Sequence, residues 1–71
     1  MINEVIILMT QDGQRSAAIA AYSLLANKSI YEVISMQLKI INQQHEDWDL
    51  NDVSWAVSYA DTIYDNIIGL V

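Results

Sequence analysis

The side chains that could take part in chemistry are concentrated in residues 42–71. This segment holds six carboxylates and no lysine or arginine, so it carries the whole net charge of −6. Asp61 and Asp65 are one helical turn apart, and Asp47, Asp49 and Asp52 precede them. Paired carboxylates can act as general acid and base, and an acidic strip can attract a basic protein surface.

Catalysis is the less probable of these two uses. Carboxylates transfer protons efficiently when a cleft raises a pKa, and nothing in the sequence indicates a cleft. The sequence has no glycine-rich phosphate loop, nucleophile elbow or zinc-ligand spacing. Cysteine is absent and His45 is the only histidine, which argues against disulfides and against thiolate or histidine metal sites. We therefore expect a non-enzymatic protein without cofactor or metal.

Aromatic residues accompany the acids, since both tryptophans, Trp48 and Trp55, lie in the same segment. Trp55 and Tyr59 are one turn apart and lie off the expected apolar stripe of their helix, which favours a role as anchors for a partner or a second subunit. The alternative is that Trp55 folds under residues 45–49 and belongs to the core of the monomer. The predicted partner-binding residues are Trp48, Asp52, Trp55, Tyr59, Asp61 and Asp65.

The acidic strip allows more than one function. We expect an inhibitor or adaptor that binds a basic protein surface, with the size and charge of a small phage anti-defence protein or antitoxin. Alternatively, the strip only keeps an apolar helical oligomer in solution. A small-ligand binder that stacks a ring on a tryptophan at a subunit interface is a further alternative. The negative charge should repel nucleic acid and anionic membranes.

Length and composition indicate one small domain, residues 1–71, that associates with itself. A chain of this size buries only about 60% of its unfolded surface, and small domains commonly need an additional source of stability. With 54% hydrophobic residues and no cysteine, oligomerisation is the source that the composition favours. No apolar run approaches the roughly 18 residues of a membrane span, and no basic segment suggests a signal peptide. A cytoplasmic location follows as the default.

The pattern of residues predicts an all-α bundle of three to four helices. The chain has no proline and two glycines, so helix breakers are rare. Residues 3–10 are ambiguous between helix and strand, with helix favoured, and Asp12-Gly13 indicates a turn. Residues 14–26 form a helix that is apolar nearly all round, which predicts that it is buried.

A second helix is expected from Ser29 to about Gln44. Ser29 and Glu32 fit the capping box, in which each side chain satisfies a free backbone amide of the other. The apolar arc of this helix spans roughly 220°, so it must be covered on two sides. A lone buried amide can set the register of a symmetric interface, and Gln37 lies inside the arc. The expected assembly is a dimer or higher oligomer through this helix and the helix over residues 14–26. The predicted interface residues are Ile30, Val33, Ile34, Gln37, Leu38 and Ile41.

The last helix is expected over residues 50–68, after an acidic loop at 45–49. Asp49 should cap it, and Gly69 should end it. Its expected core stripe consists of Val53, Ala56, Val57, Ala60, Ile63, Tyr64, Ile67 and Ile68.

One segment resembles the helix-turn-helix motif of DNA-binding proteins. The resemblance covers about 20 residues and rests on the spacing of Ile19, Ala20, Leu25, Ser29, Ile30, Tyr31 and Val33. It implies a DNA-binding regulator with Ser29, Tyr31 and Glu32 near the start of the recognition helix. Leu24 occupies the position where that family usually has a turn glycine, and the pI of about 4.1 is opposite to the basic character of DNA-binding domains.

Overall fold

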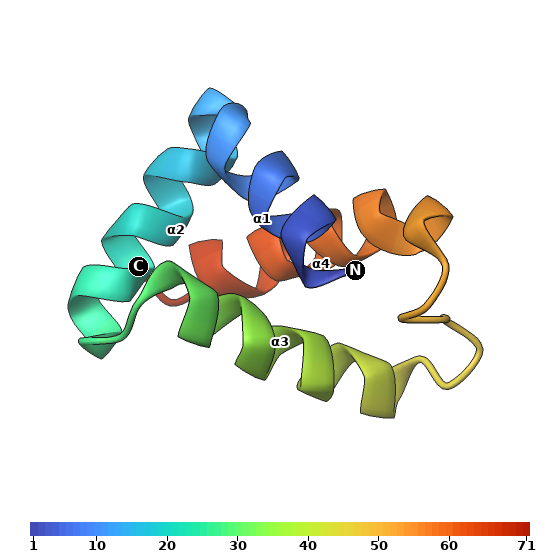
Figure 1. Cartoon of the computed structure of the whole chain (residues 1–71). Helices are drawn as coiled ribbons and strands as arrows, with labels where there is room; N and C mark the ends of the chain where they lie inside the picture. Colours follow the sequence, from blue (N-terminus) through green and yellow to red (C-terminus); the bar gives the residue numbers. More distant parts are fainter.

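The computed structural model describes residues 1–71 and is all-helical, as the sequence predicts (Figure 1). Its elements are α1 (Ile2–Gln11), α2 (Gly13–Ala26), α3 (Ile30–Gln44), the short 3-10 helix η1 (Val53–Trp55) and α4 (Ala56–Ile68). Each α-helix contacts the other three, and α4 contributes the most buried residues to the core. None of the helices combines the length and the apolar character that crossing a membrane would require.

The first two helices are separated by a single residue. Residues 3–10 belong to α1, so the preference for helix over strand is confirmed. Asp12 has an extended backbone conformation, and its Oδ1 accepts hydrogen bonds at 3.0 Å from the backbone N–H groups of Gln14 and Arg15. This cap satisfies free amides of the first turn of α2 and fixes the angle between α1 and α2.

The turn between α2 and α3 is built from local hydrogen bonds. Asn27 adopts the left-handed conformation with φ of 54°, which asparagine tolerates better than most residues. The Lys28 N–H donates to the Ser23 carbonyl at 3.1 Å and closes the end of α2. The capping box is confirmed, since the Glu32 N–H donates to Ser29 Oγ at 3.1 Å and the Ser29 N–H donates to Glu32 Oε1 at 3.3 Å.

The core contains only apolar or aromatic side chains, and every α-helix contributes to it. A chain of this length gains most of its stability from such a cluster. Its buried members are Val5, Met9, Ile19, Val33, Ile34, Leu38, Ile41, Ala56, Tyr59, Ala60, Ile63 and Ile67.

The prediction that residues 14–26 form a buried helix is wrong. Only Ile19 of α2 is fully buried, whereas Leu24 and Leu25 are exposed. The helix packs one side on the bundle, and no other helix of the chain covers the other side.

The predicted oligomer interface on α3 faces the interior of the single chain. Val33, Ile34, Leu38 and Ile41 are all buried in the core, so they are not accessible to a second subunit. The half-buried Gln37 accepts a hydrogen bond at 3.1 Å from Asn66 Nδ2 and thereby links α3 to α4. The predicted cover on a second side of α3 is also absent, since Tyr31, Met36 and Ile40 remain exposed. One core-facing stripe is sufficient to hold α3 in the bundle.

The last helix begins later than predicted, and its buried stripe is the predicted one only in part: Ala56, Ala60, Ile63 and Ile67 are buried as expected. Residues 50–52 are non-helical, and the cap of η1 is Asp52 in place of Asp49. Of the predicted stripe, Val53, Val57 and Ile68 are exposed, and Tyr59 enters the core instead. The late start lets Trp48 and Leu50 fold back against the core, which a helix beginning at residue 50 would prevent.

Candidate functional site: an acidic loop on an aromatic cluster

The connection between α3 and η1 is a chain of short turns. We call residues 45–52 the acidic loop. In each turn a backbone N–H donates to the carbonyl three residues earlier. The donors and acceptors are Trp48 and His45 at 3.0 Å, Asp52 and Asp49 at 3.1 Å, and Trp55 and Asp52 at 3.0 Å. These bonds give the loop a defined path from the end of α3 to the start of α4, at one end of the molecule (Figure 1).

A cluster of rings holds the loop against the bundle, with Trp48 at its centre. The Trp48 ring stacks on His45 with centroids 4.1 Å apart and on Trp55 at 5.5 Å. It also meets the Tyr59 ring edge-on at 5.3 Å. Offset stacking and edge-to-face contacts are the geometries that aromatic pairs favour. The ring of a loop residue therefore joins the loop to η1 and α4.

Tyr59 is the part of this cluster that lies in the core. Its side chain is 0% exposed, and its hydroxyl donates a hydrogen bond to Asn42 Oδ1 at 3.0 Å. Burial raises the pKa of Tyr59, and the nearby negative charges of Asp49 and Asp47 add to the effect. The prediction that Tyr59 lies on an outer face is therefore wrong. Trp55 is half-buried and packs against the core through the cluster, and its predicted contact with a partner stays a prediction.

The carboxylates of the loop point to solvent. Four acids occur among the seven residues 46–52, and all four are exposed. Asp49 Oδ1 accepts from the Asn51 N–H at 2.8 Å, and Asp52 Oδ1 accepts from Ser54 Oγ at 2.8 Å and from its N–H at 3.0 Å. The Ser54 side chain, and then its backbone, lower the pKa of Asp52. Glu46 and Asp47 make no hydrogen bond or ion pair with the rest of the protein.

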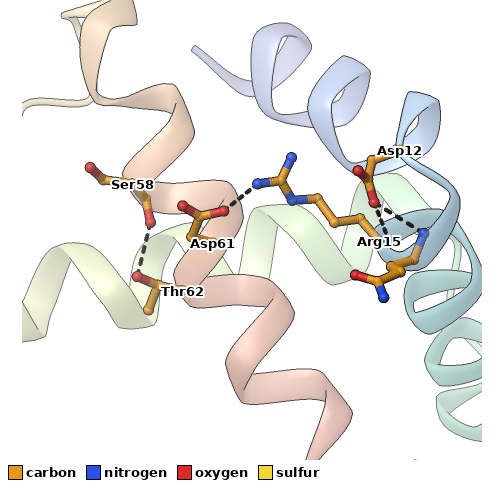
Figure 2. A network of polar contacts seen from close by, with 6 residues as sticks. Asp12, Arg15, Ser58, Asp61 and Thr62 are labelled. Atoms are coloured by element: carbon orange, nitrogen blue, oxygen red, sulfur yellow. Dashed lines mark hydrogen bonds and ion pairs between the residues drawn. The ribbon is translucent and has the colours of Figure 1, made fainter.

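The two aspartates of α4 differ from the loop acids. Figure 2 shows the Arg15 side chain extending from α2 to the carboxylate of Asp61 on α4, where the two form an ion pair. The same view shows Thr62 Oγ1 donating to the Ser58 carbonyl at 2.9 Å within α4. Asp65 is exposed and has no such partner. The predicted acidic strip on α4 is therefore neutralised in part by a cation from the other half of the chain.

The structure thus assembles some of the predicted contact residues and separates others. Trp48, Trp55 and Asp52 lie together at the loop, whereas Asp61 is engaged with α2. Sequence reasoning gave too little weight to Glu46, whose signal was the density of acids between residues 46 and 52. It missed Asn42 altogether, because a hydrogen-bond partner from another helix has no signature in the sequence.

The surface has no pocket, and no cluster of three or more potential metal ligands is present. Comparison of the chain with protein-family models, curated proteins and solved structures gives no match.

Proposed function

We propose that the protein is a non-enzymatic interaction module, an inhibitor or adaptor, whose acidic loop binds a basic surface on another protein. The observation that supports this proposal is the density of exposed carboxylates in the loop, four within seven residues. An inhibitor of the kind that phages or toxin–antitoxin systems encode would fit this size and charge.

No cation of the chain forms an ion pair with the carboxylates of the loop. Residues 42–71 contain no cation, and Arg15, which reaches this half of the chain, is paired with Asp61. A surface of one sign raises the association rate with a surface of the opposite sign and suppresses unsuitable partners. The loop acids therefore supply steering and specificity.

The order of the loop favours binding as well. Its turns are closed by backbone hydrogen bonds, and Trp48 fixes it to the bundle. A loop that is ordered before binding loses less conformational entropy when the complex forms. The half-buried rings of Trp48 and Trp55 lie beside the acids, and a partner arginine can stack on such a ring while it pairs with a carboxylate.

Self-association is the second part of the proposal. Eleven large apolar side chains remain exposed in a chain of 71 residues. Exposed apolar surface of this extent is typical of proteins that use part of it for binding. It supports an assembly of several copies.

An arginine-rich peptide without tryptophan or tyrosine tests the loop directly, because Trp48 and Trp55 report binding by fluorescence. The loop variant Glu46→Gln with Asp47→Asn and the control Asp65→Lys both change the net charge from −6 to −4. We expect saturable binding by the wild type and the control, and at least about tenfold weaker binding by the loop variant at physiological salt. Equal weakening by both variants, or no saturable signal with the wild type, would contradict the proposal.

A further inference from the structure

The outer face of α2 is apolar and nothing covers it. Leu24 is 83% exposed and Leu25 is 69% exposed, the highest values among the large apolar side chains. A surface helix normally presents charged or polar residues to solvent. Between Gln14 and Asn27, the exposed residues of α2 are Ala17, Ala20, Ala21, Leu24 and Leu25.

These residues form one continuous face. At about 100° per residue, they fall within an arc of roughly 140°, with Leu24 near its middle. Arg15 is the only charged residue within α2, and it points away from this arc toward Asp61. Both leucines therefore lie on a face without charge, on a helix whose other side is packed against the bundle.

We propose that this face pairs with the same face of a second copy of the chain, with the two α2 helices antiparallel about a two-fold axis near Ala20. This inference deepens the self-association in the proposed function and does not depend on the basic partner.

Opposite charges at the two ends of α2 favour a second copy of the chain as the partner and an antiparallel orientation of the two helices. Asp12 precedes α2 and Lys28 follows it, and each is eight residues from Ala20, or about 12 Å along the helix. An antiparallel pair centred on Ala20 therefore places Lys28 of one copy beside Asp12 of the other, at both ends. Both side chains are exposed, and neither takes part in the ion pairs within the chain.

The shape of the face suits the same register. Leu24 of one copy lies opposite residue 16 of the other, where its neighbours on the face are Gly13 and Ala17. These small residues leave room for the leucine and let the two helix axes approach closely. Because α2 contains no acid and lies at the opposite end of the molecule from the acidic loop (Figure 1), contact here also keeps the acidic loops of two chains of charge −6 away from the interface.

The first experiment measures the mass of the protein alone by sedimentation, up to about 1 mM, where even weak association is visible. We expect the mass to rise with concentration from 8.0 kDa toward twice that value. Leu24→Glu should remain a monomer, while the control Met36→Glu, which adds the same charge on the exposed side of α3, should associate like the wild type. A monomeric wild type, or loss of association only in Met36→Glu, would overturn the inference.

The second experiment tests the register by single cysteines, since the chain has none of its own. A disulfide needs Cα atoms within about 7 Å of each other. In the antiparallel pair Ala20→Cys meets itself across the axis, whereas two copies of Leu24→Cys are offset by about 12 Å along the helices. Ala20→Cys should therefore cross-link under mild oxidation much faster than Leu24→Cys. Equal rates would indicate parallel pairing and the reverse order a two-fold axis nearer Leu24, and either result would refute this register.

The third experiment tests the charges at the ends. Lys28→Glu places like charges together twice in each dimer, so its dissociation constant should rise by about tenfold at low salt and by less at high salt. An unchanged dissociation constant would exclude contact between Lys28 and Asp12. All three assays lack a basic partner, so their failure is distinguishable from failure of the acidic loop to bind one.

Discussion

Replacing Trp48 by alanine tests whether ring packing fixes the acidic loop to the bundle. The indole contacts His45 within the loop, Trp55 in η1 and Tyr59 in α4. Alanine removes all three contacts and leaves the turns of the loop held by their backbone hydrogen bonds. We expect the loop to detach from α4 while the four helices persist.

The size of the effect follows from the surroundings of the ring. Aromatic pairs contribute about 0.5–1.5 kcal/mol beyond their buried area, and truncation of a core tryptophan costs about 3–5 kcal/mol. Trp48 is half-buried, and solvent can fill the space that it leaves, so we expect a loss of about 2–3 kcal/mol. In a domain of this length, the midpoint of thermal unfolding should fall by about 10–20 °C.

The assay is thermal unfolding followed by far-UV circular dichroism, with two comparison variants. Trp48→Phe keeps a ring in the cluster and should lose less than half as much stability. Val57→Ala removes an exposed apolar side chain from α4 and should change the free energy of unfolding by less than about 0.5 kcal/mol. If Trp48→Ala melts within a few degrees of the wild type, the loop is not held by its rings and the argument for an ordered binding surface fails.

Three other perturbations address the polar contacts. Tyr59→Phe removes the hydrogen bond to Asn42 and should lower the free energy of unfolding by about 1 kcal/mol. Adding Asn42→Ala to this variant should lower it little further, which a double-mutant cycle would measure. Asp61→Asn removes an exposed ion pair and should lower stability by at most about 1 kcal/mol, with a smaller difference at high salt in thermal melts. Asp52 has a lowered pKa, so its stabilisation is present above the usual value of about 3.9 and is lost as the pH falls through the lower folded value. In Asp52→Asn this loss of stability at low pH should be absent, although the amide oxygen can still accept from Ser54. Unfolding followed by tryptophan fluorescence at several pH values would measure the difference.

The sequence predicts the elements of this fold better than it predicts their packing. The capping box of Ser29 and Glu32 is recognisable because both partners are local, and the helices follow from the scarcity of breakers. One edge of the buried face of α4 was misjudged because Val57 and Tyr59 are both suitable core residues that flank the stripe of Ala56, Ala60, Ile63 and Ile67 on opposite sides. The path of the loop decides between them, since Trp48 covers Tyr59 and nothing covers Val57.

The same limitation explains the error on α2 and α3. An apolar residue indicates that burial of its side chain is favourable. It does not indicate whether the chain has another element that covers it. In this chain one side of α3 is covered inside the bundle while Tyr31, Met36 and Ile40 stay exposed, and α2 is left with Leu24 and Leu25 in solvent. The broad apolar arcs of α2 and α3 are therefore compatible with burial in the core and with burial in an interface. The number and positions of the other helices decide between the two.

The positions of the two proposed surfaces have a consequence for binding. The acidic loop and α2 lie at opposite ends of a molecule whose longest dimension is 30 Å (Figure 1). A dimer paired through α2 therefore leaves both acidic loops free and directs them away from the interface. Two weak contacts with a partner that repeats its basic surface would then act together, and the second contact benefits from the high effective concentration that the first creates. Leu24→Glu should consequently weaken binding to such a repeated surface and leave binding to a single arginine-rich peptide unchanged, which separates the role of α2 from that of the loop.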